Sequence, residues 1–468
     1  MAYAITQPCC ADASCVAVCP VNCIHPAPGE PDFGSTDLLY IDPRTCIDCG
    51  ACTDACPVEA IVPVERLTGA DTEYAEQSAA YYRGRTAEPA WPQPEIPSSL
   101  PWAGKRGGAR APRVAIVGTG PAACYTAEAL LHSTGARITL YERLPVPGGL
   151  LRFGVAPDHP ATRRMLDSFA PLLRHPRIEL RLDTEVGRDV SHRELTDRYD
   201  AVVYAVGAAS SRALAVPGAG RLPGSLTAGR LVAWYNGHPD VPGNAVDLRE
   251  VRRAVVVGTG NVALDAARML ATAPERLADT EIAAHALAAL RSSALREVVV
   301  LGRRGPEHAA WTWPELHAIR HHPDFDLLLD EEGRVDLTAP PADSGRRRVV
   351  VRFSTAIEAA EPRPEGRDRL GAVRATGAGT IPAELLVAAI GQRGAPVPGL
   401  PFDPAAAVVP NQRGRVDGLP RTYVAGWIKR GPNGGIGANR GCAQETVDAL
   451  IEDLAAAAAA AAPVPALG

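Results

Sequence analysis

The sequence predicts an α/β protein in which two Rossmann-like dinucleotide-binding domains follow a small α+β domain rich in cysteine. The first observation is a repeated Gly-Thr-Gly-x-x-Ala motif, at 118–123 and 258–263, each time between a short apolar strand and a helical run. The second is that nine of the eleven cysteines fall between positions 9 and 56. With 468 residues, the chain is long enough for about three domains.

The composition is that of a globular protein, with 46% hydrophobic residues, 22% charged residues and a net charge of −5. No apolar run reaches the roughly 18 residues that a membrane helix needs, and the first residues lack the pattern of a secretory signal. Residues 1–65 carry a net charge of −8, which leaves +3 for the rest. This asymmetry predicts that the two parts attract each other or a shared partner, unless the acids are only a solvated surface. We expect a soluble, cytoplasmic protein that binds neither nucleic acid nor membrane.

Changes in composition along the chain set the expected domain boundaries. Prolines, glycines and arginines dominate the stretch before residue 113 and are typical of a semi-extended linker. The expected segments are a cysteine-rich domain (1–65), a linker (66–112), the first part of one nucleotide domain (113–215), a second nucleotide domain (216–387), the return of the first (388–454) and an Ala-rich tail (455–468).

The clustered cysteines form two runs of similar spacing, at 9–20 and at 46–57. The second run reads Cys-x2-Cys-x2-Cys-x3-Cys-Pro, which is the spacing of bacterial ferredoxins, in which three thiolates hold one iron–sulfur cluster and the fourth ligates another. The first run repeats this spacing, but Asp12 stands in place of its second cysteine. Because a carboxylate is a harder and more labile ligand than a thiolate, we expect either a [3Fe–4S] cluster or a [4Fe–4S] cluster with Asp12 on one iron. Crossed ligation assigns Cys9, Asp12, Cys15 and Cys56 to this cluster, and Cys19, Cys46, Cys49 and Cys52 to a [4Fe–4S] cluster.

Three alternatives concern the cysteines. Cys10 competes with Cys9, although its spacing fits less well. Cys23 has no position in either motif and is expected to be a buried free thiol beside a cluster. A structural zinc site is disfavoured, because zinc sites use two separate CxxC pairs.

The two glycine loops are followed by strand ends of opposite charge. Gly118, Gly120 and Ala123 permit a tight turn that brings the helix N-terminus to a pyrophosphate. Glu142 ends the next strand, where a carboxylate accepts the ribose hydroxyls of an adenine nucleotide, unless it is simply solvated. After the second loop the strand ends at Arg303 and Arg304, which suit a 2′-phosphate and favour NADPH over NADH. The longer interval there is explained by an inserted helical stretch at about 274–295.

Several motifs together resemble the adrenodoxin-type ferredoxin–NADP reductases over roughly 113–452, and residues 1 to about 65 resemble a two-cluster bacterial ferredoxin. The whole chain therefore resembles the bacterial fusion of a seven-iron ferredoxin with such a reductase. Beyond the first glycine loop, the motifs are Gly149-Leu-Leu-Arg-Phe-Gly-Val-Ala-Pro-Asp-His159, Gly260-Asn-Val-Ala-Leu-Asp265, Gly302-Arg-Arg-Gly-Pro306 and Gly426-Trp-Ile-Lys-Arg-Gly-Pro432.

This resemblance implies a set of cofactor contacts. Asp158 and His159 are expected near the contact of nicotinamide and flavin, with Trp427 beside the flavin ring. Asp158 could instead be a turn or N-cap residue, Glu315 an exposed helical residue and Trp427 part of the core. The implied FAD contacts are Ala122, Glu142, Leu150, Val186, Trp427, Gly434, Gly435 and Ile436. The implied NADP contacts are Gly260, Asn261, Val262, Ala263, Arg303, Arg304 and Glu315, with Gly434 shared between the cofactors.

The expected activity is that of a ferredoxin–NADP(+) reductase with FAD and NADP(H) as cofactors. Hydride would pass from nicotinamide C4 to flavin N5, and single electrons would then pass to the clusters and to an external acceptor protein, for example a ferredoxin or a cytochrome P450. One alternative is a subunit that feeds electrons into a glutamate-synthase-like complex, whose small subunit has the Gly148-Gly-Leu-Leu151 pattern. Another is a non-enzymatic redox sensor. A disulfide-reducing flavoenzyme is disfavoured, since Cys124 and Cys442 form no paired motif.

Overall fold

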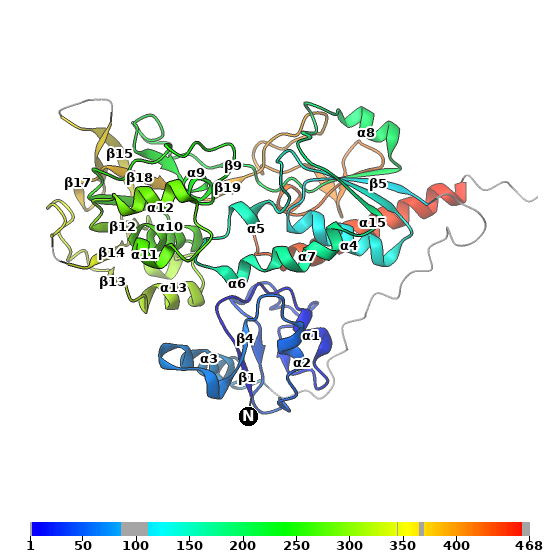
Figure 1. The fold of residues 1–468 in the computed structure, drawn as a ribbon, viewed down its shortest axis with the longest axis horizontal. Helices are drawn as coiled ribbons and strands as arrows, with labels where there is room; N and C mark the ends of the chain where they lie inside the picture. The colour runs from blue at the N-terminus through cyan, green and yellow to red at the C-terminus, as the bar shows by residue number, and fades with distance from the viewer. Residues whose placement is uncertain (1, 86–110, 344, 365–368, 461–468) are drawn as a thin grey trace, which may run out of the picture. The chain divides into compact units, whose positions relative to one another are not determined.

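The structure, a computed structural model, describes residues 2–85, 111–343, 345–364 and 369–460. The chain forms two compact units (Figure 1). The first consists of Met1–Arg152, Ala161–Ala209 and Arg393–Gly468, and the second of Phe153–Pro160 and Ser210–Gln392. The breaks after Ala209 and Gln392 lie near the expected boundaries at 215 and 387, whereas the cysteine-rich segment is not divided from the rest of the first unit and the short segment around Asp158 belongs to the second unit.

Residues 2–85 of the first unit form a small α+β module, which we name the cysteine module. Two short antiparallel strand pairs frame it, β1 with β4 and β2 with β3. Ile5, Ile24 and Ile41 are buried in its core. The elements of its two halves are β1 (Tyr3–Ile5), α1 (Ser14–Val18), β2 (Ile24–His25), β3 (Tyr40–Ile41), α2 (Ala51–Ala55) and β4 (Ile61–Pro63).

The expected linker begins later than the sequence predicted. After η1 (Val64–Arg66) and η2 (Gly69–Thr72), helix α3 (Glu73–Tyr81) packs on β1 and β3. The hydroxyl of the buried Tyr82 donates to the carbonyl of Tyr40 at 2.8 Å, which ties this segment to the module. Residues up to 85 are therefore folded, and the rest of the expected linker, 86–110, lies outside the described residues.

A seven-stranded sheet forms the centre of the rest of the first unit. Its middle strands are buried on both faces, which is typical of a parallel sheet covered by helices. Helices α4 (Pro121–Ser133) and α15 (Ala438–Ala460) lie side by side and contribute to one core cluster (Figure 1). The strand order is β20 (Asn411–Gln412), β21 (Arg415–Val416), β22 (Thr422–Val424), β8 (Ala201–Tyr204), β5 (Arg113–Val117), β6 (Arg137–Tyr141) and β7 (Ile178–Arg181). Further helices are α7 (Met165–Leu173) and α8 (His192–Arg198).

The second unit contains a six-stranded parallel sheet and a three-stranded antiparallel sheet, β15 (Ile357–Pro362), β16 (Leu370–Ala375) and β17 (Gly379–Pro382). The inserted helical stretch predicted near 274–295 is present as α11 (Pro274–Leu277) and α12 (Ala284–Arg291). The other helices are α9 (Ala228–Tyr235), α10 (Asn261–Ala271) and α13 (Trp313–Arg320). The parallel strand order is β10 (Ser225–Thr227), β18 (Leu385–Ala388), β11 (Arg253–Val257), β12 (Glu297–Leu301), β14 (Arg347–Arg352) and β13 (Phe325–Asp330).

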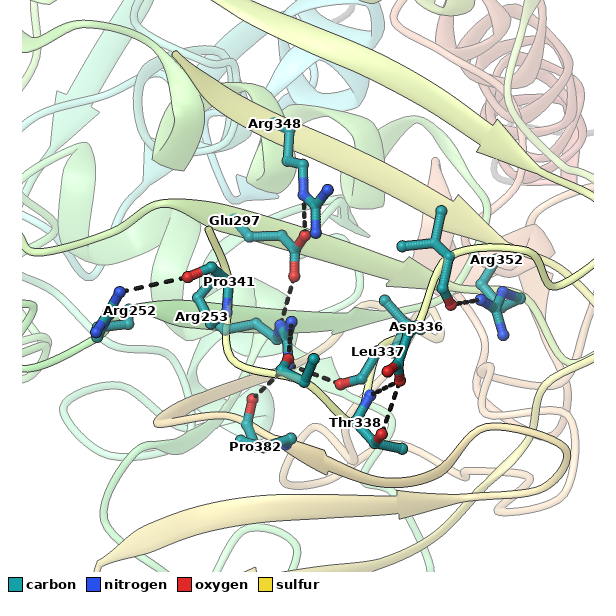
Figure 2. Close-up of polar contacts among 12 residues, drawn as sticks. Arg252, Arg253, Glu297, Asp336, Leu337, Thr338, Pro341, Arg348, Arg352 and Pro382 are labelled. Atoms are coloured by element: carbon teal, nitrogen blue, oxygen red, sulfur yellow. Dashed lines mark hydrogen bonds and ion pairs between the residues drawn. The ribbon is translucent and has the colours of Figure 1, made fainter. Parts of the chain in front are cut away.

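A buried ionic network joins the amino-terminal ends of these parallel strands (Figure 2). Arg253 and Glu297 are paired at 2.5 Å and are both almost completely buried, and Arg348 pairs with the second oxygen of Glu297. Arg253 also donates to the carbonyls of Leu337 and Ala339, at 2.7 and 2.8 Å. A buried charge is tolerated only when it is paired and hydrogen-bonded. These groups therefore have a structural role at the edge of the sheet opposite to the glycine loop.

Both predicted nucleotide domains are thus present as helix-covered sheets, parallel throughout in the second unit and with an antiparallel edge, β20–β21–β22, in the first. No helix in the part of the chain that the structure describes is long and apolar enough to cross a membrane.

Candidate functional site

The two cysteine runs fold into ligand loops of the same backbone shape. We name residues 9–15 the first ligand loop and 46–52 the second; their numbers differ by 37. Ala11 and Asp48, at matching positions, have φ of 52° and 60°. Ala13 and Gly50, the next matching pair, have φ of 60° and 77°, and each loop leads directly into a five-residue helix. The repeat in the sequence is therefore a repeat in structure, and Asp12 takes the backbone position of Cys49.

Each predicted ligand set lines its own pocket. The first pocket is lined by Cys9, Asp12, Cys15 and Cys56, with Cys10 and apolar side chains such as Ile5 and Leu39. The second pocket is lined by Cys19, Cys46, Cys49 and Cys52, with Cys23 and apolar neighbours. The structure thus brings together the two crossed sets of four residues that the spacing predicted.

The electrostatics of the pockets fit metal-bound thiolates. Burial raises the pKa of Cys9 and of Cys52 to about 11, so these thiols are neutral in the absence of a cation. A hydrogen bond from Cys23 lowers the pKa of Cys19 to about 5. Iron, when bound, would supply the positive charge that converts thiols such as Cys9 and Cys52 into thiolate ligands, with release of protons. Two apolar pockets with four donors each match clusters held by cysteine.

Cys10 lines the first pocket and Cys23 lines the second, each beside the predicted ligands of that pocket. Burial raises the pKa of Cys15 well above its usual value, and Cys9, Asp12 and Cys56 add to this effect. These three groups are the predicted partners of Cys15 in the first pocket. Cys23 is buried, and its sulfur lies 3.4 Å from that of Cys19. This is the position expected for a free thiol next to a cluster.

The first glycine loop is shaped by close backbone contact. Gly118 has φ of +106°, and a Cβ there would lie 2.6 Å from the carbonyl oxygen of Ala205. The hydroxyl of Thr119 donates to Glu142 at 2.5 Å and accepts from the backbone N–H of Gly148 at 3.1 Å. Glu142 is only 8% exposed and also accepts from a backbone N–H. The carboxylate is therefore held in place at the strand end by the loop itself.

The other predicted FAD residues lie in this same unit. Ala122 and Ala123 are buried in the first turn of α4, whereas Leu150, which opens α5 (Leu150–Phe153), is 41% exposed. Trp427 begins α14 (Trp427–Arg430), and its indole N–H donates to the carbonyl of Gly434 at 3.3 Å. Gly435 is exposed and Ile436 partly buried. Val186 packs in a core cluster on the face of the seven-stranded sheet opposite to the face that Ala122 and Ala123 cover.

The second glycine loop has the same construction. Gly258 has φ of +130°, and a Cβ there would lie 2.2 Å from the carbonyl oxygen of Ala389. Asn261 and Thr312 exchange two hydrogen bonds, at 2.8 and 3.2 Å, which ties the loop to the start of α13 and thereby positions Glu315. The predicted contact Gly260 precedes α10, and Val262 and Ala263 lie in the first turn of that helix, where Val262 is 43% exposed and Ala263 is buried.

Arg303 and Arg304 follow β12 and are exposed. Within the described ranges, neither guanidinium group has a hydrogen-bond or ion-pair partner. This contrasts with Arg253 at the opposite edge of the same sheet, where every interaction is internal (Figure 2). Two adjacent unpaired cations at the carboxyl edge of a parallel sheet are available to bind a phosphate.

His159 lies close to Asp265 and Glu315 in the second unit, and the preceding residue, Asp158, pairs with Arg268. Ligand atoms of His159, Asp265 and Glu315 all lie within 4.8 Å of one another. Arg268, buried on α10, forms ion pairs with both Asp158 and Asp265. Burial lowers the pKa of Arg268, but Asp265 and Asp158 outweigh this and raise it overall. The second oxygen of Asp158, Oδ1, is buried and has no hydrogen-bond partner in the described part of the chain.

Sequence reasoning did not select three residues of these sites, namely Thr119, Asp265 and Arg268. Thr119 carried a signal, because threonine lies between the glycines in both copies of the motif. Asp265 and Arg268 are spaced three apart on one helix face, a pattern that predicts a local ion pair. The pairing of Arg268 with Asp158, 110 positions away, has no such local signal.

Together, these features define a class: a pyridine nucleotide oxidoreductase with two nucleotide domains, joined to an iron–sulfur module. The family model "Pyridine nucleotide-disulphide oxidoreductase" matches residues 112–297, and "4Fe-4S binding domain" matches 39–62.

Similarity to known proteins identifies the family within this class. The chain is 46% identical to the "Probable ferredoxin/ferredoxin--NADP reductase" of Mycobacterium bovis, over 97% of this chain and 84% of that protein. It is 38% identical to the mitochondrial "NADPH:adrenodoxin oxidoreductase" of Arabidopsis thaliana, over 73% of this chain and 82% of that one. The solved structure of Mycobacterium tuberculosis FprA in complex with NADPH matches with a TM-score of 0.69 and 40% identity, over 75% of this chain and 86% of the other. The chain therefore belongs to the ferredoxin/ferredoxin–NADP reductases, which are NADPH-dependent flavoprotein oxidoreductases.

Proposed function

We propose that this chain moves electrons between NADPH and two iron–sulfur clusters held by its own cysteine module, and from there to an external acceptor protein. The observation that supports this proposal most is a combination of two features in one chain. Two pockets are each lined by four predicted cluster ligands, and the strands that follow the two glycine loops end in residues of opposite charge. NADPH gives up two electrons as a hydride, whereas clusters take one electron at a time. FAD, when bound, supplies the conversion between the two.

The two nucleotide sites are proposed to have different occupants. The buried Glu142, held by Thr119, suits the ribose of an FAD that stays bound. The exposed pair Arg303 and Arg304 suits the 2′-phosphate of an NADPH that exchanges. Asp158 and His159 are proposed to orient the nicotinamide, with Arg268 holding Asp158 in place. Gly434, Gly435, Ile436 and Trp427 are proposed to lie beside the flavin ring.

The two clusters are proposed to differ in iron content. Asp12 already accepts a hydrogen bond from Ser14, which favours a [3Fe–4S] cluster in the first pocket over a [4Fe–4S] cluster ligated by Asp12. The second pocket, with four cysteines, suits a [4Fe–4S] cluster. All eleven cysteines are free, which is consistent with the reducing cytoplasm that we propose as the location.

The decisive experiment removes both arginines at the NADP strand end. Steady-state NADPH oxidation is measured with ferricyanide as acceptor for the Arg303→Ala, Arg304→Ala double variant. Each lost charge-assisted contact is worth about 1.5–3 kcal/mol, so the KM for NADPH should rise at least about tenfold. The KM for NADH, which lacks the 2′-phosphate, should change less than about twofold.

Arg291→Ala is the matched control, because Arg291 is an exposed arginine of the same unit at the end of α12. It should leave both KM values unchanged. Equal increases for NADPH and NADH in the double variant would show that the arginines do not read the 2′-phosphate. A purified protein without flavin or iron absorbance would reject the proposed function as a whole.

A further inference from the structure

The first ligand loop contacts the carboxyl-terminal part of the first unit. The backbone N–H of Gly437 donates to the carbonyl of Cys10 at 2.9 Å. Arg440, in the first turn of α15, donates from Nη1 to the carbonyl of Asp12 and to the hydroxyl of Ser14, both at 3.1 Å. The segment that precedes Gly437 is Gly434–Ile436, the proposed flavin contact. The first ligand loop therefore contacts the residue that directly follows the proposed flavin contacts.

Gly437 allows this approach because it has no side chain. A Cβ at this position would lie 2.1 Å from the carbonyl oxygen of Ala11 and 2.5 Å from the backbone nitrogen of Asp12. Real Cβ atoms essentially never come so close to backbone atoms. Glycine at 437 is thus required for the loop to sit where it does.

Tyr125 approaches the same loop from α4, the helix that follows the first glycine loop. Its side chain is 5% exposed, and its hydroxyl has no hydrogen-bond partner among the described residues. Burial raises the pKa of Tyr125, and the charges of Asp12 and Cys10 raise it further. The Arg440 guanidinium carbon lies 6.0 Å from the centre of the tyrosine ring. A buried hydroxyl without a partner costs free energy unless a bound group accepts its hydrogen bond.

An ion pair also holds the module to the rest of the first unit. Arg164 pairs with Glu59, which follows the last ligand of the first pocket, Cys56, by three residues. The Arg164–Glu59 pair thus joins an acid of the module to an arginine of the rest of the first unit (residues 111–152, 161–209 and 393–460), which we name the flavin-binding part. It is one instance of the attraction that the uneven charge of the sequence suggested as one of its explanations. The second ligand loop has a different environment: Cys49 is exposed, and Ile47 is 58% exposed.

We propose that electrons enter the cysteine module at the first ligand loop, and that Arg440 and Tyr125 are positioning residues that hold this loop against the flavin-binding part. The proposal rests on the proposed function. FAD, when bound, would take a hydride from NADPH and would return it as two single electrons and a proton. The donors Cys9, Asp12, Cys15 and Cys56 would hold the cluster that takes each electron first, and the second set of four cysteines would hold the cluster that passes it to the external one-electron acceptor. No covalent bond forms or breaks at the loop.

The test uses the full-length holoprotein under anaerobic conditions and two variants, Arg440→Gln and Tyr125→Phe. After rapid mixing with NADPH, flavin bleaching and iron–sulfur reduction are followed separately by absorbance and by EPR of freeze-quenched samples. We expect the Arg440 variant to bleach its flavin at the parent rate, while cluster reduction slows at least about tenfold, because two charge-assisted hydrogen bonds are lost. The Tyr125 variant should show a smaller slowing and a shifted midpoint potential of the first cluster.

A third measurement does not depend on turnover. Hydrogen–deuterium exchange of the amides in residues 10–16 should rise in Arg440→Gln and return to the parent level in Arg440→Lys. Arg413→Gln is the control, because it removes another ion pair to α15, with Glu452, far along the helix. It should change neither exchange nor cluster reduction.

Three results would overturn the proposal. The first is cluster reduction at the parent rate in Arg440→Gln, and the second is unchanged exchange of the loop in that variant. Loss of iron in the variants, measured directly, would assign Arg440 a purely structural role and would also reject it. Absence of flavin or iron from the parent protein itself would instead reject the proposed function, so the two failures are distinguishable.

Discussion

The two ligand loops have nearly the same backbone but differ in side chains and in surroundings. Left-handed residues recur at matching positions, and α1 and α2 begin at matching residues, Ser14 and Ala51. The main chemical difference is Asp12 against Cys49. Since the backbone is the same in both, the number of irons bound should depend on this one side chain rather than on the fold.

The surroundings differ as much as the ligands. The side chain of Asp12 is 11% exposed and lies beneath Arg440 of the flavin-binding part, whereas Cys49 is exposed. A covered loop suits exchange of electrons inside the chain, and an exposed loop suits exchange with a partner. Two copies of one motif can therefore take different roles in electron transfer when one copy is covered by the rest of its own chain and the other is exposed.

The largest effect is expected when the second loop is made to resemble the first. Cys49→Asp should reduce the iron content from about seven to about six per chain, because the carboxylate replaces the thiolate that holds the fourth iron. It should also add a second EPR signal of the oxidised [3Fe–4S] type. Iron analysis and EPR of anaerobically purified protein provide the measurement.

Cys23→Ala is the matched control for this change, because Cys23 lines the same pocket without a position in the motif. Its iron content should stay at the parent value. An unchanged EPR spectrum and iron content in Cys49→Asp would mean that Cys49 is not a ligand, and that the likeness of the two loops does not extend to their chemistry.

The reverse change is expected to have the next largest effect. Asp12→Cys should raise the iron content from about seven to about eight per chain and remove the EPR signal of the oxidised [3Fe–4S] cluster, since both loops then offer four thiolates. Asp37→Cys is the control, because Asp37 belongs to the module but to neither pocket. A parent protein that already holds about eight irons would favour the Asp12-ligated [4Fe–4S] cluster instead.

Local patterns in the sequence predicted much of this structure. The spacing of the cysteines predicted the two groups of four donors that line the two pockets, because a short loop allows few ways to gather four donors. The two Gly-Thr-Gly motifs identified the sheets and the ends of β6 and β12, because parallel strands present their following loops at one edge. Glu142 and the arginines after β12 could therefore be placed without coordinates.

Contacts between distant segments could not be predicted in this way. Arg440 and Asp12 are 428 positions apart, and neither residue alone indicates the other. The prolines and glycines from Pro89 onward predict a linker over 66–112 and do not indicate helix α3, and the hydrogen bond from Tyr82 to Tyr40 exists only in the folded module. Arg268 was missed because its second partner, Asp158, comes from another part of the chain. A single motif can be located from a short stretch of sequence. The contacts that cover a motif cannot, because they come from residues far away in the sequence.

The smallest expected effect comes from the residue that follows the aspartate. Ser14 donates to Asp12 and accepts from Arg440, and the matching residue of the second loop is Ala51. Ser14→Ala therefore removes two hydrogen bonds at a position where the fold itself tolerates alanine. We expect a loss of about 1 kcal/mol in the free energy of unfolding, a lower Tm for the module and an unchanged iron content of about seven. Thermal unfolding followed by the iron–sulfur absorbance measures the first two quantities. Iron loss from Ser14→Ala would mean instead that the hydroxyl is needed for assembly of the first cluster, and that the two loops differ by more than one essential side chain.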